Sequence, residues 1–245
     1  MNEIFEGELK HIEPYRLIKE DIDDPLARFF LVLAVIYNDL KGLSIFEKLV
    51  IDTYRPVELE EVSVQVGELG GLFTQIGKLF ISNIKEFFDF LKENENILLS
   101  SEFKEVLSKI NNKDIENRWK DIIDVAFDRS PESSDFTKHL ILIRNNVAFH
   151  YNQSGKELKK SFCNFFYKKE KIGKNDLAYY SIGETIYDTR FFYADGAVQE
   201  YLRSAKGDQL DGFDIKYKKE ISKLIYNMSF TISRLLKAYL KNRPK

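Results

Sequence analysis

The sequence contains few of the residues that cross-link a chain or turn it sharply, and each shortage excludes a class of protein. Its single cysteine, Cys163, cannot form an internal disulfide framework. The 12 glycines and 5 prolines among 245 residues supply too little turn chemistry for an all-β protein. The 3 histidines and the lone cysteine show no zinc-site spacing, and glycine loops of the Walker or dinucleotide type are missing. These shortages favour an all-α protein that uses neither a metal nor a nucleotide cofactor.

Long hydrophobic runs and a strong charge imbalance are missing as well. The longest uninterrupted apolar run, Phe29 to Tyr37, is too short to span a bilayer. The acidic stretch Met1 to Glu6 lacks the basic and apolar regions of a signal peptide. The formal net charge of -2 excludes the overall positive field of a non-specific nucleic-acid coat. We therefore expect a reduced, cytoplasmic, soluble protein with no membrane partner.

Apolar residues, by contrast, are abundant and recur at helical spacing. Hydrophobic residues make up 44% of the sequence, with 20 phenylalanines and 13 tyrosines, which is ample for a substantial core. Steps of three or four between apolar positions predict helices over residues 25–42, 45–55, 57–92, 100–110, 113–127, 136–151, 154 onward, 197–202 and 214–240. Segment 57–92 is predicted to be the spine of one helical domain covering residues 1–245, in which residues 173–212 form a variable insert.

Individual residues predict where the first of these helices begins and ends, and where the spine packs closely or bends. Asp24 followed by Pro25 predicts an N-cap, and Gly42 predicts the end of the same helix. Within the spine, Gly70-Gly71 predicts either a kink or a place where a second backbone comes close. Close packing is the favoured interpretation of the two glycines.

The most informative stretch is Arg144-Asn145-Asn146-Val147-Ala148-Phe149-His150. An arginine guanidinium can grip two phosphate oxygens at once, and a histidine imidazole can take and give a proton near neutral pH. Attack by a ribose 2′-hydroxyl on the neighbouring phosphate requires both phosphate binding and proton transfer. The pair Arg144 and His150 therefore suits the cutting of RNA without a metal ion.

The motif is predicted to lie inside one helix and to end close to the next. Ser134 or Asp135 can cap the first helix, whose apolar period continues to Tyr151. Ser154 begins a capping-box pattern, which predicts the start of the next helix there. His150 would then occupy the last turn of the first helix, where the exposed carbonyl groups raise its pKa.

An Arg followed by a polar residue, often Asn, and by a His a few positions later resembles the signature of the HEPN superfamily (higher eukaryotes and prokaryotes nucleotide-binding). Asn145 fills the polar position. The resemblance implies a HEPN-like helical bundle and metal-independent endoribonuclease activity that leaves a 2′,3′-cyclic phosphate and a 5′-hydroxyl. It implies that His150 acts as general base or acid, that Arg144 stabilises the charge of the transition state, and that Asn145 positions the arginine or the phosphate.

The same resemblance implies a biological setting. Family members of this kind often act as toxins of toxin–antitoxin modules or as abortive-infection effectors in antiviral defence. An antitoxin or a sensor protein is therefore an implied partner, beside RNA.

The geometry of one helix favours cooperation between two copies of the chain. Six residues along an α-helix turn by about 600° and rise by about 9 Å, so Arg144 and His150 point roughly 120° apart. A two-fold partner would bring second copies of both side chains to the same cleft. We therefore expect a homodimer whose interface includes the helix of residues 136–151, in agreement with the composite sites that HEPN ribonucleases commonly build.

Further contacts to RNA are expected from residues within and after the motif. Lys156, Lys159 and Lys160 begin a segment that mixes positive charge with aromatic rings, which suits binding to a phosphate backbone. Asn146 and Tyr151 are further candidates for substrate contact. The plainer interpretation is a solvated lysine face and, for Tyr151, half-buried packing.

A second class of function fits the same residues. In that interpretation the protein is a non-catalytic helical module that binds RNA or a partner protein. Arg144 then makes a surface ion pair, and His150 is a hydrogen-bonded residue at a helix end. Cutting of RNA in the presence of EDTA separates the two classes, because a binding module retains RNA without cleaving it.

Overall fold

The computed structural model describes residues 10–54, 63–145, 151–167, 177–185, 187, 189–204 and 213–241. Side chains are described at all of these except 151–155, 203–204 and 213–218. The regular elements in these ranges are helices, with one isolated antiparallel β-bridge between Ser181 and Arg190. The all-α prediction is confirmed. In chain order the helices are α1 (Pro14–Leu17), α2 (Pro25–Tyr54), α3 (Val64–Glu93), α4 (Glu95–Leu99), α5 (Ser101–Ser108), α6 (Lys113–Ala126), α7 (Pro131–Ile143), α8 (Tyr151–Tyr167), α9 (Phe192–Ser204) and α10 (Phe213–Lys241).

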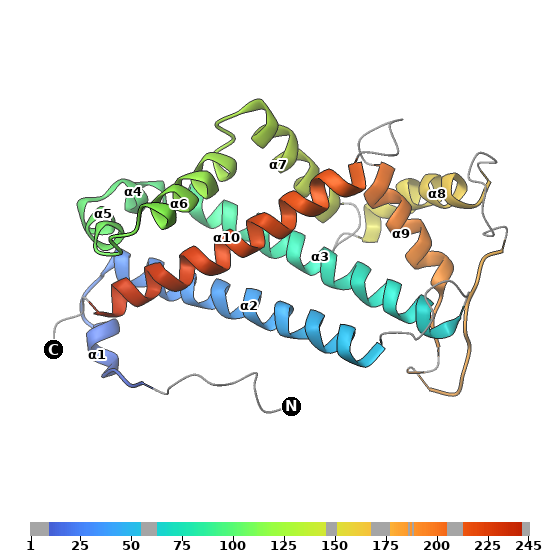
Figure 1. Ribbon diagram of the computed structural model, residues 1–245, viewed down its shortest axis with the longest axis horizontal. Helices are drawn as coiled ribbons and strands as arrows, with labels where there is room; N and C mark the ends of the chain where they lie inside the picture. Colours follow the sequence, from blue (N-terminus) through green and yellow to red (C-terminus); the bar gives the residue numbers. More distant parts are fainter. Residues whose placement is uncertain are drawn as a thin grey trace.

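Three long helices, α2, α3 and α10, run along the length of the molecule (Figure 1). Helices α4, α5 and α6 gather at one end, and α8 and α9 lie at the other (Figure 1). Helix α3 contacts α2, α6, α7, α9 and α10, so it joins the two ends. This is the role of a spine, which the length of its apolar period predicted.

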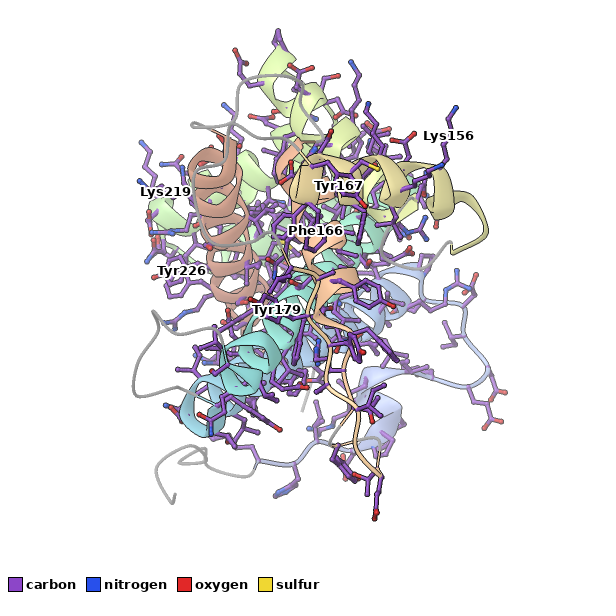
Figure 2. The ribbon with its side chains drawn as sticks, turned by 90° about the vertical axis from the view of Figure 1, so that its right-hand side faces the viewer. Lys156, Phe166, Tyr167, Tyr179, Lys219 and Tyr226 are labelled. Carbon is purple, nitrogen blue, oxygen red and sulfur yellow. The ribbon has the colours of Figure 1, made fainter. Side chains whose placement is uncertain are left out.

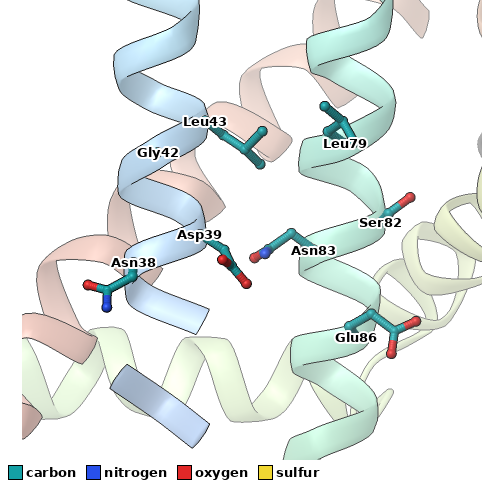
Figure 3. Close-up of a pocket in the computed structure, with 8 residues that line it drawn as sticks. All are labelled: Asn38, Asp39, Gly42, Leu43, Leu79, Ser82, Asn83 and Glu86. Carbon is teal, nitrogen blue, oxygen red and sulfur yellow. The ribbon is translucent and has the colours of Figure 1, made fainter. Parts of the chain in front are cut away.

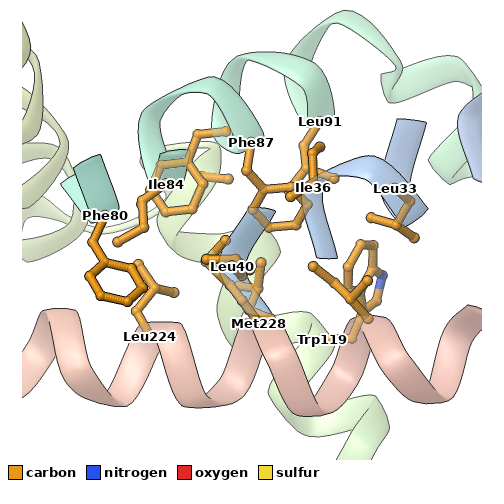
Figure 4. Close-up of a cluster of buried hydrophobic side chains, with 14 of the residues drawn as sticks. Leu33, Ile36, Leu40, Phe80, Ile84, Phe87, Leu91, Trp119, Leu224 and Met228 are labelled. Carbon is orange, nitrogen blue, oxygen red and sulfur yellow. The ribbon is translucent and has the colours of Figure 1, made fainter. Parts of the chain in front are cut away.

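The core lies where the three long helices meet. Four side chains at steps of three or four on α3, Phe80, Ile84, Phe87 and Leu91, present one apolar stripe (Figure 4). They face buried residues of α2, α6 and α10, namely Leu33, Ile36, Leu40, Trp119, Leu224 and Met228. Burial of each such side chain stabilises the fold by about 1.5–3 kcal/mol relative to exposure in water. The bundle is therefore held together chiefly by the apolar faces of its helices.

The start of α2 is as predicted, and its end is not. The Asp24 side chain accepts a hydrogen bond from the backbone N–H of Ala27 at 2.9 Å, which is an N-cap. The helix then continues through Gly42 without a break to Tyr54, where two helices were predicted. A glycine destabilises a helix by only about 1 kcal/mol, and α2 carries buried residues both before Gly42, at Leu40, and after it, at Val50. Burial of these apolar side chains outweighs the helix-ending tendency of Gly42.

Two other predicted helix starts are wrong. Helix α7 begins at Pro131 under Ser130, whose hydroxyl accepts from the Ser133 N–H at 3.1 Å, and so begins ahead of the expected cap at Ser134 or Asp135. Residues 131–134, which lie between the predicted helices 113–127 and 136–151, are therefore helical. Helix α8 begins at Tyr151, so the capping-box serine, Ser154, lies within its first turn and does not start it.

The remaining helix boundaries agree better with the sequence. Ser63 caps α3 by accepting from the Val66 N–H at 3.2 Å, and the earlier part of the predicted spine, up to residue 62, lies outside the described residues. Helices α5, α6 and α10 match segments 100–110, 113–127 and 214–240. The short helices α1 and α4 were not predicted.

The described part of the segment predicted as a variable insert, residues 173–212, includes a helix that packs on the bundle. Helix α9, longer than the predicted 197–202, packs on α3 and α8. Arg190, just before it, makes ion pairs with Glu68 of α3 and with Asp195, both at 2.9 Å. Burial alone lowers the pKa of Arg190, but these carboxylates outweigh it and the pKa is raised.

Arg190 also accounts for the glycine pair in the spine. A Cβ atom built on Gly71 would lie 1.9 Å from Nη2 of Arg190. The glycines are closely packed, as the favoured interpretation held, but a side chain comes close there and not the predicted second backbone. Gly67, one turn earlier, meets the ring of Phe192 in the same way, with a built Cβ 2.5 Å from the ring.

Helix α2 is long and apolar enough to cross a membrane, judged by length and composition alone, since an 18-residue window has a mean hydropathy of 1.6. The core helix of a soluble protein passes the same test, and α2 supplies Phe29, Leu33 and Leu40 to the core. However, only 28% of that window is buried. A large apolar part of α2 is therefore left uncovered by the described residues.

Candidate functional site

The first motif residue, Arg144, lies where helix α7 ends. Phe136, Leu140 and Ile143 are buried and fix this end of α7 on the bundle, where α7 contacts α3. Arg144 and Asn145 continue the chain in the wider π-helical geometry and are half-buried. Such π-turns occur frequently at functional sites, because they alter the direction of side chains at a helix end.

Arg144 has a carboxylate partner on the spine. Its Nη2 atom contacts Oε1 of Glu86, which lies 58 positions earlier in the sequence, on α3. The Arg144 side chain is 34% exposed and that of Glu86 is 59% exposed, so the pair sits at the surface and is screened by solvent. An exposed pair of this kind is worth about 0–1 kcal/mol. The guanidinium is therefore held in place but could exchange the carboxylate for a phosphate, since both suit its planar fork.

Glu86 also borders a cavity of about 510 Å³ between α2 and α3 (Figure 3). The side chains of Asp39 and Asn83 point toward one another across it. Two buried polar atoms, Ser82 Oγ and Asn83 Oδ1, make no hydrogen bond within the part of the chain that the structure describes. The other lining residues are Asn38, Gly42, Leu43 and Leu79.

The electrostatics of this cavity decide what it can accept. Asp39 and Glu86 are acidic and would repel an RNA phosphate inside the cavity. A phosphate would instead meet Arg144 from the solvent side. Sequence reasoning missed both the cavity and Glu86. The available signal was weak: polar residues interrupt the apolar period of two predicted helices that pack on each other.

The rest of the motif is only partly described. Asn146 and the catalytic candidate His150 lie outside the described residues, and so does the side chain of Tyr151, the first residue of α8. The raised pKa predicted for His150 rested on a helix that ends near Tyr151. Because α8 begins at Tyr151, that argument no longer stands.

The three lysines expected to bind RNA are exposed on α8. Lys156, Lys159 and Lys160 all face solvent, and Figure 2 shows Lys156 pointing away from the body of the protein. The opposite face of α8 packs on α9 through buried Ser161 and through Phe165, whose ring lies 3.3 Å from a Cβ built on Gly196. Packing therefore fixes the direction of the lysines.

Among the side chains that the structure describes, no three His, Cys, Asp or Glu residues are placed to hold a metal ion. Comparisons with protein-family models, with curated proteins and with solved structures found no match.

Proposed function

We propose that this protein is a metal-independent endoribonuclease of the HEPN type, with a HEPN-like helical bundle as its fold. The observation that supports it most is the position of Arg144, which is partly exposed at the end of α7 in a surface ion pair that a phosphate can replace. Asn145 follows it directly, and His150 follows six residues later. No other group of residues in the sequence suggests a different chemistry as clearly.

In the proposed reaction the ribose 2′-hydroxyl attacks the adjacent phosphorus. His150 acts as general base or acid, and the P–O5′ bond breaks, which leaves a 2′,3′-cyclic phosphate and a protonated 5′-hydroxyl. Arg144 stabilises the added negative charge, and Asn145 positions Arg144 or the phosphate. Asn146, Tyr151 and the lysines of α8 contact the RNA on either side.

The proposal includes partners and a setting. The protein acts in the cytoplasm as a homodimer whose interface includes the helix of residues 136–151. It serves as a toxin or as an abortive-infection effector in antiviral defence, and an antitoxin or a sensor protein controls it.

The test is RNA cleavage by the purified protein in EDTA. His150→Ala lowers the rate by about two to four orders of magnitude, the usual contribution of a positioned general acid–base. His11→Ala, at an exposed position far from the motif in sequence, is the matched control and leaves the rate unchanged. Sequencing of the RNA ends reports the cyclic phosphate. A strict requirement for a divalent metal would falsify the mechanism.

A second candidate function rests on the same ion pair. If Arg144 serves only to hold α7 on α3 through Glu86, the protein is a non-catalytic helical module that binds RNA or a partner protein. Wild-type protein would then retain RNA in EDTA without cutting it. Arg144→Ala would alter stability and not RNA chemistry.

A further inference from the structure

Helix α2 carries an apolar stripe that no described part of the chain covers. Leu31, Val32, Val35, Phe46 and Leu49 are each at least 40% exposed. Isolated exposed apolar residues are ordinary, but a contiguous row along one helix marks an interaction surface. This stripe lies on the flank of α2, turned by roughly 120° from the core residues Phe29, Leu33 and Leu40, and beside the cavity shared with α3.

The stripe has the spacing of a helix–helix seam. Residues 32, 35, 39, 42, 46 and 49 alternate steps of three and four, the period at which two helices stay in contact. All six are exposed. The seam is Val, Val, Asp, Gly, Phe, Leu, so its apolar residues are at both ends and its small and charged residues are in the middle.

This order is self-complementary about a point between Leu40 and Lys41. An antiparallel second copy places Val32 opposite the partner's Leu49 and Val35 opposite the partner's Phe46. Asp39 then lies opposite the partner's Gly42, and a Cβ built on Gly42 meets nothing within 4 Å, so the carboxylate has room there. A two-fold interface requires this kind of match of one surface with itself.

The charges at the two ends of the seam agree with the same orientation. Arg28 is near the start and Asp52 near the end, with side chains 64% and 58% exposed. Within one copy Arg28 pairs with Asp23 at 3.0 Å and Asp52 pairs with Lys48 at 3.7 Å, so a partner would add to these exposed pairs. An antiparallel partner brings Arg28 next to the partner's Asp52 at both ends, whereas a parallel partner brings like charges together. Charge and shape therefore favour one register.

We infer that α2 is a dimerisation helix that binds a second copy of this chain in an antiparallel, two-fold arrangement centred between Leu40 and Lys41. The surface is continuous with the candidate site, because the cavity at Gly42 is also bordered by Glu86, the partner of Arg144. One interface can therefore include both α2 and the end of α7. The inference deepens the homodimer part of the proposed function and does not depend on RNA cleavage.

Cysteine cross-linking tests the register. In a Cys163→Ser background, the double variant Val35→Cys with Phe46→Cys forms a disulfide-linked dimer under mild oxidation. Each single variant fails to link with itself, because two Val35 positions in the antiparallel register lie about 16 Å apart along the axis, beyond the reach of a disulfide. Efficient linkage of the single Val35→Cys variant would show a parallel or different pairing and overturn the inference.

Light scattering of the full chain tests whether a second copy of the chain binds to α2. The wild type is a dimer, and Val35→Glu weakens association by at least about tenfold, because it places a charge against the partner's Phe46 in an apolar part of the seam. Leu99→Glu, at a position 60% exposed on α4, is the control and remains dimeric. A monomeric wild type overturns the inference. So does binding of α2 to phosphatidylcholine vesicles that Val35→Glu abolishes without any dimer. Neither outcome decides whether the protein cleaves RNA, which the cleavage assay in EDTA tests separately.

Discussion

At the scale of single residues, Glu86 competes with phosphate for the guanidinium of Arg144 in the proposed mechanism. Its carboxylate occupies part of the guanidinium fork that the proposed mechanism assigns to phosphate. We predict that Glu86→Gln tightens RNA binding by about two- to tenfold, since the competing charge is removed while the side-chain shape is kept. The measurement is RNA affinity by fluorescence anisotropy, with His150→Ala in both proteins so that no cleavage occurs.

The control for this variant is Glu105→Gln on α5, which removes the carboxylate of another exposed ion pair, with Lys109 just after that helix. It leaves RNA affinity unchanged. Both variants change the free energy of unfolding by less than about 1 kcal/mol, as expected for exposed pairs. An RNA affinity that does not respond to Glu86→Gln would support the purely structural role of Arg144.

The Arg144–Glu86 contact also marks the limit of what the sequence can predict about the site. The motif identified Arg144 and Asn145, which are half-buried at the end of α7, and their catalytic role stays a prediction. The partner lies 58 positions away on another helix, and nothing local to either residue indicates the pairing. Contacts of this kind depend on how helices pack, which periodicity does not report.

At the scale of helices, the glycines of α3 differ in what surrounds them. We predict that Gly71→Ala lowers the free energy of unfolding by about 1–3 kcal/mol, because its Cβ would lie 1.9 Å from Nη2 of Arg190. That guanidinium is 15% exposed and is fixed by Glu68 and Asp195, so it cannot move aside without breaking ion pairs. Urea unfolding followed by circular dichroism measures the change.

The same helix supplies the matched control. Gly77→Ala meets nothing within 4 Å, so it should stabilise the protein by up to about 1 kcal/mol through the better helix propensity of alanine. Equal losses from the two substitutions would mean that close packing on Arg190 is not what requires glycine at position 71.

The lysines of α8 belong to this scale too, because their common direction comes from packing of the opposite face on α9. We predict that Lys156→Gln, Lys159→Gln and Lys160→Gln together weaken RNA binding and flatten its salt dependence. Each lost phosphate contact reduces the slope of log affinity against log salt by about 0.7–0.9. The fold is unaffected, since all three side chains are exposed. An unchanged slope would mean that the lysines are a solvated face.

Helices were predicted from the sequence better than their ends were. The apolar periods of α3 and α10 extend over many turns, so tertiary packing and periodicity give the same result. Ends depend on weaker local signals, and two of these were misleading, at Gly42 and Ser154. Asp24 and Ser63 cap their helices because each side chain accepts a hydrogen bond from a backbone N–H of the first turn.

At the scale of the whole molecule, the buried apolar residues form a cluster that runs through helices from α2 to α10. Phe30 of α2 stacks on Tyr239 of α10 with ring centroids 4.0 Å apart, which ties the two ends of the chain together. That residues 1–245 form a single domain stays a prediction. A single domain of this kind should unfold in one cooperative step.

Two probes in one protein test that prediction. Trp119, the single tryptophan, is 5% exposed in the core, so its fluorescence reports the centre of the bundle. Circular dichroism reports all helices, including α8 and α9 at the far end. We predict that the two unfolding curves coincide. We also predict that Met228→Ala, which empties a fully buried position on α10, shifts both curves together by about 2–5 kcal/mol. The opposite result would be a helical signal that persists after the tryptophan transition, or one that Met228→Ala leaves unchanged. Either would show that α8 and α9 fold apart from the core and that the chain has two domains.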